Sequence, residues 1–340
     1  MPLVRVIIPT YNRAALLREA IHSVLEQSFQ DYEIVVADDG STDDTARVLD
    51  EAAGRESRLR FVILGHGGAA RARNAAVRQP GDFRYAAFLD ADDLWLPHHL
   101  EESVRVLEEE PGIGLVFADN EIWDLTGDWT ETAIQSRAAR HKNAVGLASR
   151  SPKPGVHVLD GAVCRRAMCG NEIMPVLSTV VVRKAAVTRS DWFDARLSVM
   201  EDCAFFFFLA AGGHPFCFLD SVHTRYRCHG DNLTGTALDL SSPVLLSRYQ
   251  SVLLYQKIKL DLPLTSGERA LVRGDAAMAA YLLAQAYAEQ GDLERARSHY
   301  ADALGYRASW AAFKSSVLSR LPAPLFYGLR RLRGAVVSGT

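Results

Sequence analysis

Cysteine is scarce in this sequence of 340 residues, and long apolar runs are missing. The five cysteines form no Cys-x-x-Cys pair and no zinc-ligand spacing, which excludes a disulfide scaffold or a zinc ribbon and predicts reduced, mostly buried thiols. No stretch approaches the roughly 20 apolar residues of a membrane-spanning helix. Met1 to Leu3 lead directly into an apolar run, so no signal peptide fits and we expect a cytoplasmic protein.

Glycine-rich phosphate loops are missing as well. No Gly-x-Gly-x-x-Gly follows the first apolar run, so the fingerprint of dinucleotide-binding domains is absent. No Gly-x-x-x-x-Gly-Lys-Ser/Thr loop occurs, which excludes phosphate binding of the P-loop type. The main body of the chain is acidic, which argues against a nucleic-acid partner. A diphosphate ligand would therefore need a metal ion to offset its charge.

Apolar runs alternate with amphipathic stretches along the N-terminal third, which is typical of βαβ units and a mostly parallel sheet with flanking helices. We expect strands over residues 4–9, 32–37, 59–64, 85–90 and 113–118. We expect helices over residues 14–27, 44–53 and 94–110. At 48% hydrophobic and 23% charged residues, the chain can bury a large core, and we expect one large α/β domain with an appendage.

Polar clusters follow four of these strands. The clusters are Thr10–Arg13, Asp38–Asp43, Gly65–Gly68 and Asp90–Asp93. The carboxyl ends of strands in an open α/β sheet lie at one edge, where ligands bind. Side chains two apart in an extended segment point the same way, so Asp90 and Asp92 can share one ion. Carboxylates suit Mg²⁺ or Mn²⁺, although a solvated acidic loop before a helix is the alternative.

The combination of motifs resembles the family 2 glycosyltransferases, which have the GT-A fold. The matching segments are Val-Ile-Ile-Pro-Thr-Tyr-Asn-Arg (6–13), Asp-Asp-Gly-Ser-Thr-Asp-Asp-Thr (38–45), Gly68-x5-Asn74, Phe-Leu-Asp-Ala-Asp-Asp (88–93), Val-Val-Val-Arg-Lys (180–184), Trp-Phe-Asp (192–194) and Met-Glu-Asp (200–202). The resemblance covers roughly residues 3–235. It implies metal-dependent transfer of a sugar from a nucleotide diphosphate to an acceptor hydroxyl, with inversion at the anomeric carbon.

Several residues are implied by this resemblance to bind the donor nucleotide. They are Pro9, Thr10, Tyr11, Arg13, Asp38, Asp39, Arg71, Arg73, Asp90 and Ala91. Tyr11 would stack on the base, and Asp39 or Asp38 would accept a hydrogen bond from the imide of uracil. Asp38 to Gly40 also suit a turn, with Asp43 capping the next helix, and both roles can hold together. Arg71 or Arg73 would reach the phosphates, or else be exposed helix charges.

Asp202 is the expected general base of the reaction. Met200-Glu201-Asp202 begins an apolar helix with four phenylalanines, and burial there raises the pKa of an acid while the helix N-terminus lowers it. The resemblance implies that Asp202 takes the acceptor proton. Glu201, together with Asp93 and Trp192, is expected on the acceptor side.

A divalent cation, Mn²⁺ or Mg²⁺, is the expected cofactor. Asp92 would hold it, with Asp90 nearby and His229 as a further ligand. His229 matches the Tyr-Arg-x-His pattern of the family, although a lone histidine is more often structural. Neutral imidazole is an acceptable ligand for Mn²⁺ beside carboxylates.

We expect the glycosyltransferase domain to span residues 1–240, with a nucleotide-binding half over 1–120 and an acceptor half over 121–240. Residues 241–340 are expected to be helical. Within them, residues 282–296 resemble one tetratricopeptide hairpin. A single such unit cannot bury its own face, so it should pack on the catalytic domain or form a homodimer.

The tail is electrostatically distinct. Residues 303–340 hold six of the 38 basic residues and none of the 41 acidic ones, so the net charge of −3 comprises −9 before residue 303 and +6 after it. Aromatic residues interleave with these charges, which suits peripheral contact with the inner face of an anionic membrane. A helix that covers its own core is the alternative.

The sequence thus predicts transfer of one sugar at a time to a glycan or lipid-linked glycan, in cell-surface glycan biosynthesis. The membrane spans and the Gln/Arg-x-x-Arg-Trp motif of processive synthases are missing. UDP is the favoured carrier, although dTDP presents the same imide edge and GDP also occurs in the family. The alternatives are a non-catalytic nucleotide or sugar binder and a nucleotidyltransferase that makes sugar nucleotides. The sugar, the acceptor and the linkage are not readable from the sequence.

Overall fold

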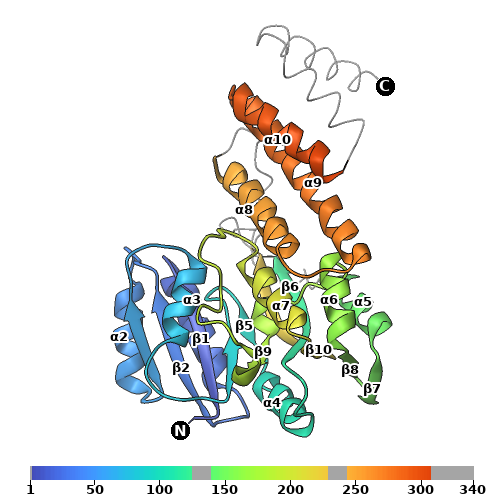
Figure 1. The fold of residues 1–340 in the computed structure, drawn as a ribbon. Helices are drawn as coiled ribbons and strands as arrows, with labels where there is room; N and C mark the ends of the chain where they lie inside the picture. Colours follow the sequence, from blue (N-terminus) through green and yellow to red (C-terminus); the bar gives the residue numbers. More distant parts are fainter. Residues whose placement is uncertain (1, 125–138, 229–242, 308–340) are drawn as a thin grey trace. The chain divides into compact units, whose positions relative to one another are not determined.

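The computed structural model describes residues 2–124, 139–228 and 243–307 (Figure 1). The chain divides into two compact units. The first comprises Met1–Arg196 with Glu201–Thr236, and the second comprises Leu197–Met200 with Ala237–Thr340. The first unit is built on a sheet, and the described part of the second is mostly helical.

A ten-stranded sheet is the centre of the first unit. Its strands are β1 (Val4–Thr10), β2 (Tyr32–Asp38), β3 (Leu59–Ile63), β4 (Tyr85–Phe88), β5 (Leu94–Trp95), β6 (Leu115–Asp124), β7 (Arg150–Lys153), β8 (Val156–Leu159), β9 (Val181–Arg183) and β10 (Phe216–Cys228). They lie in the order β3-β2-β1-β4-β9-β6-β10-β8-β7, with β5 paired to β10. Strands β1 to β4 pair in parallel as predicted, whereas β9 runs antiparallel between β4 and β6. The predicted α/β sheet is therefore confirmed, with a mixed second half.

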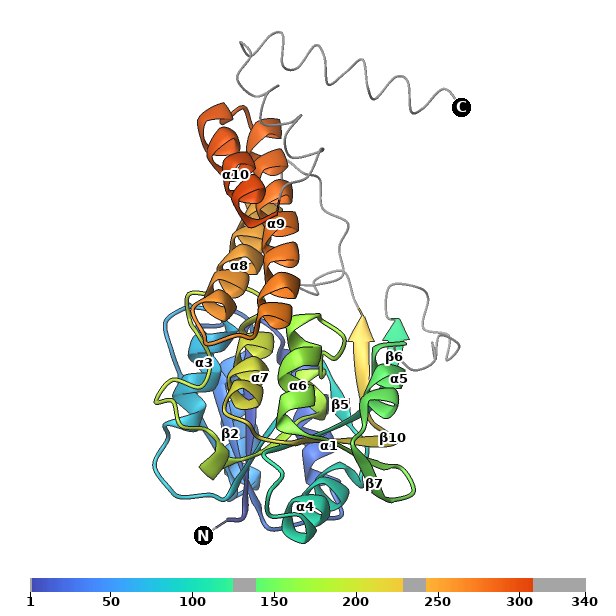
Figure 2. The same ribbon diagram turned by 45° about the vertical axis from the view of Figure 1, so that its right-hand side comes forward.

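Helices pack on this sheet (Figure 2). They are α1 (Ala14–Leu25), α2 (Thr45–Arg55), α3 (Ala69–Val77), α4 (His99–Glu109), α5 (Ala139–Leu147), α6 (Gly161–Cys169) and α7 (Glu201–Ala211), with short 3₁₀ turns at Leu177–Thr179 and Lys184–Ala186. The helix expected over 94–110 was placed too early. It begins at His99, because Trp95 and Leu94 pair with Thr224 and Arg225 of β10.

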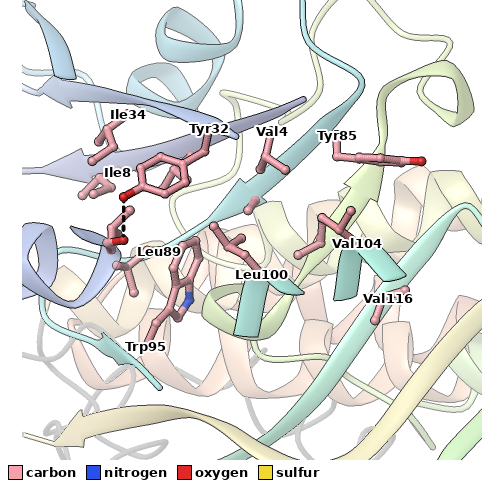
Figure 3. Close-up of a cluster of buried hydrophobic side chains, with 14 of the residues drawn as sticks. Val4, Ile8, Tyr32, Ile34, Tyr85, Leu89, Trp95, Leu100, Val104 and Val116 are labelled. Atoms are coloured by element: carbon pink, nitrogen blue, oxygen red, sulfur yellow. Dashed lines mark hydrogen bonds between the residues drawn. The ribbon is translucent and has the colours of Figure 1, made fainter. Parts of the chain in front are cut away.

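One face of the sheet packs against α1, α2 and α4. Alternate residues of β1, Val4, Val6 and Ile8, join a buried cluster with residues of these three helices. Figure 3 shows this cluster around Tyr32 and Trp95. The Tyr32 hydroxyl donates to the Val24 carbonyl at 3.0 Å, so the polar end of this buried ring is satisfied.

The opposite face of β4 meets an aromatic cluster. Phe88 lies edge-on to Trp192, Phe193 and Phe205. Trp192 is buried and stacks on Phe205 of α7, with 5.8 Å between ring centroids. The ring of Trp192 thus packs against other aromatic rings, and its predicted place on the acceptor side stays a prediction.

Helix α3 is anchored at its middle and its C-terminus. Asn74 donates to the Phe193 carbonyl at 2.7 Å and accepts from the Phe193 amide at 3.0 Å. Arg5, fully buried in β1, donates from its Nη1 to the carbonyls of Val77 and Gln79, both at 2.8 Å. Its Nε also donates to Glu33 at 2.7 Å. Arg5 thus satisfies carbonyls that the end of a helix leaves without partners.

The second unit contains α8 (Pro243–Leu260), α9 (Ser266–Glu289) and α10 (Leu293–Tyr306). A capping box between Thr265 and Glu268 begins α9. Gly291, with φ of 84°, turns the chain, and the Asp292 side chain accepts from the Arg295 amide to cap α10. Alanine, leucine and tyrosine side chains form the core of the second unit: Ala276, Ala280, Leu283, Ala284, Tyr287, Ala296 and Tyr300. The predicted hairpin helices are present, and the tetratricopeptide likeness stays a prediction.

Other predictions concern the surroundings of the chain. No described helix is long and apolar enough to cross a membrane. All five cysteines are present as thiols, and four of them are buried, as predicted. His229 and the tail from residue 308 lie outside the described residues, so the third metal ligand and the membrane contact stay predictions. The homodimer and the cytoplasmic location stay predictions too.

Candidate active site

The ends of β1 and β2 form one side of the candidate site. Thr10 and Asp38 are register partners, and the Asp39 amide donates to the Thr10 carbonyl at 2.9 Å. Asp38 accepts from the Ser41 amide at 3.0 Å and from its hydroxyl at 2.5 Å. These contacts confirm the predicted turn after β2. Asp38 and Asp39 are both buried, at 1% and 3% exposed.

Asp39 holds the loop that follows β3. Its two carboxylate oxygens accept from the amides of Gly67 at 2.9 Å and Gly68 at 2.7 Å. Gly68 has a φ of 93°, which favours glycine and directs both amides inward at the start of α3. A carboxylate has about four acceptor positions, so Asp39 retains capacity for a ligand N–H.

Aromatic rings lie beside Asp39. Tyr11 is 41% exposed and stacks on His66, with 4.2 Å between ring centroids. The Nδ1 atom of His66 is 2.9 Å from Asp39 Oδ2. Thr10 adds a buried hydroxyl oxygen without a hydrogen-bond partner among the described residues. The nucleoside residues predicted around β1 are thus close to the β3–α3 loop, and His66 is an addition that the sequence did not single out.

Arg73 links the end of β4 to the start of α7. Its guanidinium contacts Asp90 Oδ1 and Glu201 Oε1, each at 2.7 Å, and the residue is only 5% exposed. Burial alone would lower the pKa of Arg73, but the two carboxylates raise it above its ordinary value. Arg73 thus positions two acids, and its predicted contact with phosphates stays a prediction. Arg71, two residues earlier on α3, is exposed.

Asp93 attaches the turn from Asp90 to Asp93 to the protein interior. This residue is 1% exposed and accepts from the Ser178 hydroxyl at 2.5 Å and the Arg227 amide at 3.1 Å. Burial and the charges of Asp92 and Asp90 raise the pKa of Asp93 well above its ordinary value. The carboxylate of Asp93 therefore contacts buried groups, and its predicted acceptor role stays a prediction. Ala91 is also buried, at 5% exposed.

Asp90 and Asp92 are the candidate cation ligands at this edge. The Asp90 side chain is 33% exposed and keeps one oxygen away from Arg73. Two carboxylates fit Mg²⁺ or Mn²⁺, which usually take the rest of their ligands from water and substrate phosphates. Arg13, also predicted at the donor site, lines a shallow hollow with Thr42 and Asp43 at the neighbouring loops.

Glu201 and Asp202 begin α7, directly after Met200, whose φ of 68° lies in the left-handed region. The Asp202 carboxylate accepts from the Cys203 amide at 2.7 Å. Burial raises the pKa of Asp202, and Arg73 acts in the opposite direction. Burial likewise raises the pKa of Glu201 against the effect of Arg73. Of the two opposing effects expected from the sequence, desolvation is the larger one here.

Known proteins resemble this chain in sequence and in fold. Residues 5–170 match the family model described as "Glycosyl transferase family 2". The glycosyltransferase TuaG of Bacillus subtilis is 40% identical over 109 residues, which are 32% of this chain and 43% of TuaG. The chain therefore spans less than half of that relative.

Solved structures show the same fold. TarS 1-349 of S. aureus, in complex with UDP-GlcNAc, has a TM-score of 0.61 at 15% identity, covering 97% of this chain and 92% of that one. The mannosyltransferase PcManGT from Pyrobaculum calidifontis, in complex with GDP-Man and Mn²⁺, has a TM-score of 0.55 at 17% identity, covering 97% and 87%.

Proposed function

Because residues 5–170 match the model of glycosyl transferase family 2, we propose that this chain belongs to that family and moves one sugar from a nucleotide diphosphate to an acceptor hydroxyl, with inversion. One observation supports this above all. Arg73 joins Asp90, at the donor edge of the sheet, to Glu201, beside Asp202, through two contacts of 2.7 Å. One expected cation ligand, Asp90, and the residue next to the expected base, Glu201, thus belong to one ionic network.

We further propose that the nucleoside binds at the ends of β1 and β2. The exposed Tyr11 ring offers a stacking face, and Asp39 offers acceptor capacity for a uracil imide. The Thr10 hydroxyl, which has no partner among the described residues, gives a second polar contact. UDP is favoured on this basis. GDP is the principal competitor, since PcManGT was solved with GDP-Man and TarS with UDP-GlcNAc.

Charge balance supports a requirement for a cation. Asp90 and Glu201 share the single positive charge of Arg73. Two further acids, Asp92 and Asp202, are close to them in the sequence. This edge would therefore repel a diphosphate. A divalent cation held by Asp92 and Asp90 would neutralise the charge that develops on the leaving diphosphate. The cell-surface glycan acceptor, free or lipid-linked, is part of the same proposal.

The chemical step follows from the chain's own residues. Asp202 accepts the proton of the acceptor hydroxyl while the acceptor oxygen forms a bond to the anomeric carbon. The bond from that carbon to the diphosphate oxygen breaks, and the nucleoside diphosphate leaves with the electron pair. Arg73 holds Glu201 and Asp90 in place throughout, so positioning contributes to the rate. Retention of configuration in the product would contradict this scheme.

Calorimetric titration of UDP, GDP and dTDP, each with Mn²⁺ and with EDTA, tests the donor site. We expect one nucleotide to bind only with the cation, and Asp92→Ala to abolish that binding. Asp44→Ala is the matched control, because Asp44 is an exposed carboxylate on a neighbouring loop and should leave affinity unchanged. Failure of all three nucleotides would overturn the donor assignment, and unchanged binding by Asp92→Ala would overturn the cation assignment.

Tyr11 gives a separate test of the base-binding surface. Tyr11→Ala should weaken nucleotide binding by about 5- to 150-fold, because stacking of a base on an aromatic ring contributes about 1–3 kcal/mol. Tyr11→Phe keeps the ring and should bind nearly as well as the original protein. Equal affinity of all three proteins in the same titration would show that the base binds elsewhere.

A further inference from the structure

A second group of ligand-type side chains joins the start of α4 to β10. His98, Glu102 and His223 each place one ligand atom within 4.8 Å of the other two. Within this group, His223 Nε2 lies 3.3 Å from Glu102 Oε2. His98 and Glu102 are four residues apart at the start of α4, so they project from the same side of the helix. None of the three belongs to the candidate active site.

We propose that His98, Glu102 and His223 bind a zinc-class divalent cation as a site separate from the donor site. Two imidazoles and one carboxylate form a ligand set typical of Zn²⁺, whereas Mg²⁺ prefers oxygen alone. Tetrahedral zinc bonds of about 2.0–2.1 Å place ligand atoms about 3.4 Å apart. His223 and Glu102 are already at that spacing. His98 and Glu102 are partly exposed, so an ion can reach the site and His98 can adjust.

Hydrogen bonds of the two imidazoles decide which ring nitrogen of each is available to the cation. His98 Nε2 lies 3.0 Å from the Val222 carbonyl oxygen, which only accepts, so Nε2 carries the hydrogen and Nδ1 carries the lone pair. His223 Nδ1 lies 3.2 Å from His99 Nδ1. With the ion on His223 Nε2, His223 Nδ1–H donates to His99. Such a bond behind the ligand fixes its tautomer and ring orientation.

The surrounding side chains also suit a cation. Glu101, the adjacent acid, is engaged with the Ser28 hydroxyl at 2.6 Å and leaves Glu102 to face the histidines. Ser221 Oγ, at 2.9 Å from His223 Nε2, or a water, can complete the coordination.

The ion would connect α4 to β10. Farther along β10, Arg227 binds Asp93 through its amide and contacts the Asp92 carbonyl through its side chain. Zinc would therefore stiffen the strand that supports the Asp90–Asp93 turn.

Zinc titration of the full metal-free chain, with Mg²⁺ in excess, tests the proposal by stoichiometry and thermal shift. We expect one tight equivalent and a higher melting temperature. The His98→Asn/Glu102→Gln double variant should bind about 100-fold more weakly or not at all. His22→Asn/Glu26→Gln is the matched control, because this exposed pair has the same i,i+4 spacing and a 3.1 Å contact but belongs to no such group. Equal zinc binding by both double variants would overturn the proposal.

Cobalt replaces zinc for a spectroscopic readout. Four-coordinate Co²⁺ should give visible d–d absorption in the original protein and in Asp92→Asn, and none in the His98→Asn/Glu102→Gln variant. Glu102→Gln alone keeps both histidines and guards against misfolding; it should give weakened absorption with an unchanged circular dichroism spectrum. Loss of the absorption in Asp92→Asn would place the ion at the donor site instead and would overturn the proposal.

Discussion

Asp202→Asn should lower the turnover number for sugar transfer by about 10²- to 10⁴-fold, the range contributed by a positioned general base. Nucleotide affinity should change little, because the substitution leaves Arg73, Asp90 and Asp92 in place. The asparagine oxygen can still accept from the Cys203 amide, so the start of α7 should keep this hydrogen bond. Turnover and nucleotide Kd, measured on the same preparation, check both halves of this expectation.

The pH dependence of turnover gives a second readout. Burial raises the pKa of Asp202, and a base must be deprotonated to act. Turnover should therefore fall as the pH decreases through this raised pKa, at a higher pH than for an ordinary aspartate. In Asp202→Asn this acidic limb should disappear. Glu201→Gln is the comparison variant: if it alone abolished turnover while Asp202→Asn did not, Glu201 would be the base.

Arg73→Met should destabilise the first unit by about 3–5 kcal/mol, because removal of the buried guanidinium leaves the mostly buried Glu201 and the partly exposed Asp90 without a counter-charge. Methionine fills much of the same volume, so the lost charge rather than a cavity dominates. Asp90 and Glu201 would then face each other without the two 2.7 Å contacts. Urea unfolding at neutral pH measures the difference in the free energy of unfolding.

Controls separate this effect from a general loss of helix α3. Arg71→Met, an exposed neighbour on α3, should change the free energy of unfolding by less than about 0.5 kcal/mol. Adding Glu201→Gln to Arg73→Met should recover part of the loss. Without Arg73 the two carboxyl groups have a raised folded-state pKa, so the variant should gain relative stability as the pH falls through it. Equal destabilisation by Arg71→Met would refute the ionic explanation.

Local patterns were enough to predict much of the first unit. Strands β1, β2 and β3 lie within one residue of the expected ranges, because each is a short apolar run followed by turn-forming residues. A related pattern predicted the acids of the site, because carboxylates that border an apolar run indicate the end of a strand or the start of a helix. These acids are Asp90, Asp92, Glu201 and Asp202. A family resemblance then assigned roles that composition alone could not.

Long-range pairings set the limit of such predictions. Arg73 is 128 residues from Glu201, and nothing in either local sequence announces their contact. The helix at 94–110 was misplaced because Trp95 pairs with β10, which is far along the chain. Trp192 was predicted on the acceptor side, and nothing in its local sequence indicates that Phe205 and Phe88 pack against its ring. Only the tertiary structure distinguishes these cases.

The anchoring of α3 has a consequence for the thermodynamics of ligand binding. Asp39 holds the loop before this helix, Asn74 holds its middle and Arg5 holds its end, so the Arg73 side chain starts from a fixed backbone. The Arg73 side chain loses its rotamer freedom when the protein folds, so donor binding should cost little further side-chain entropy at this residue. The electric field at this edge is therefore set in the free protein, and the reorganisation free energy of the reaction is correspondingly small.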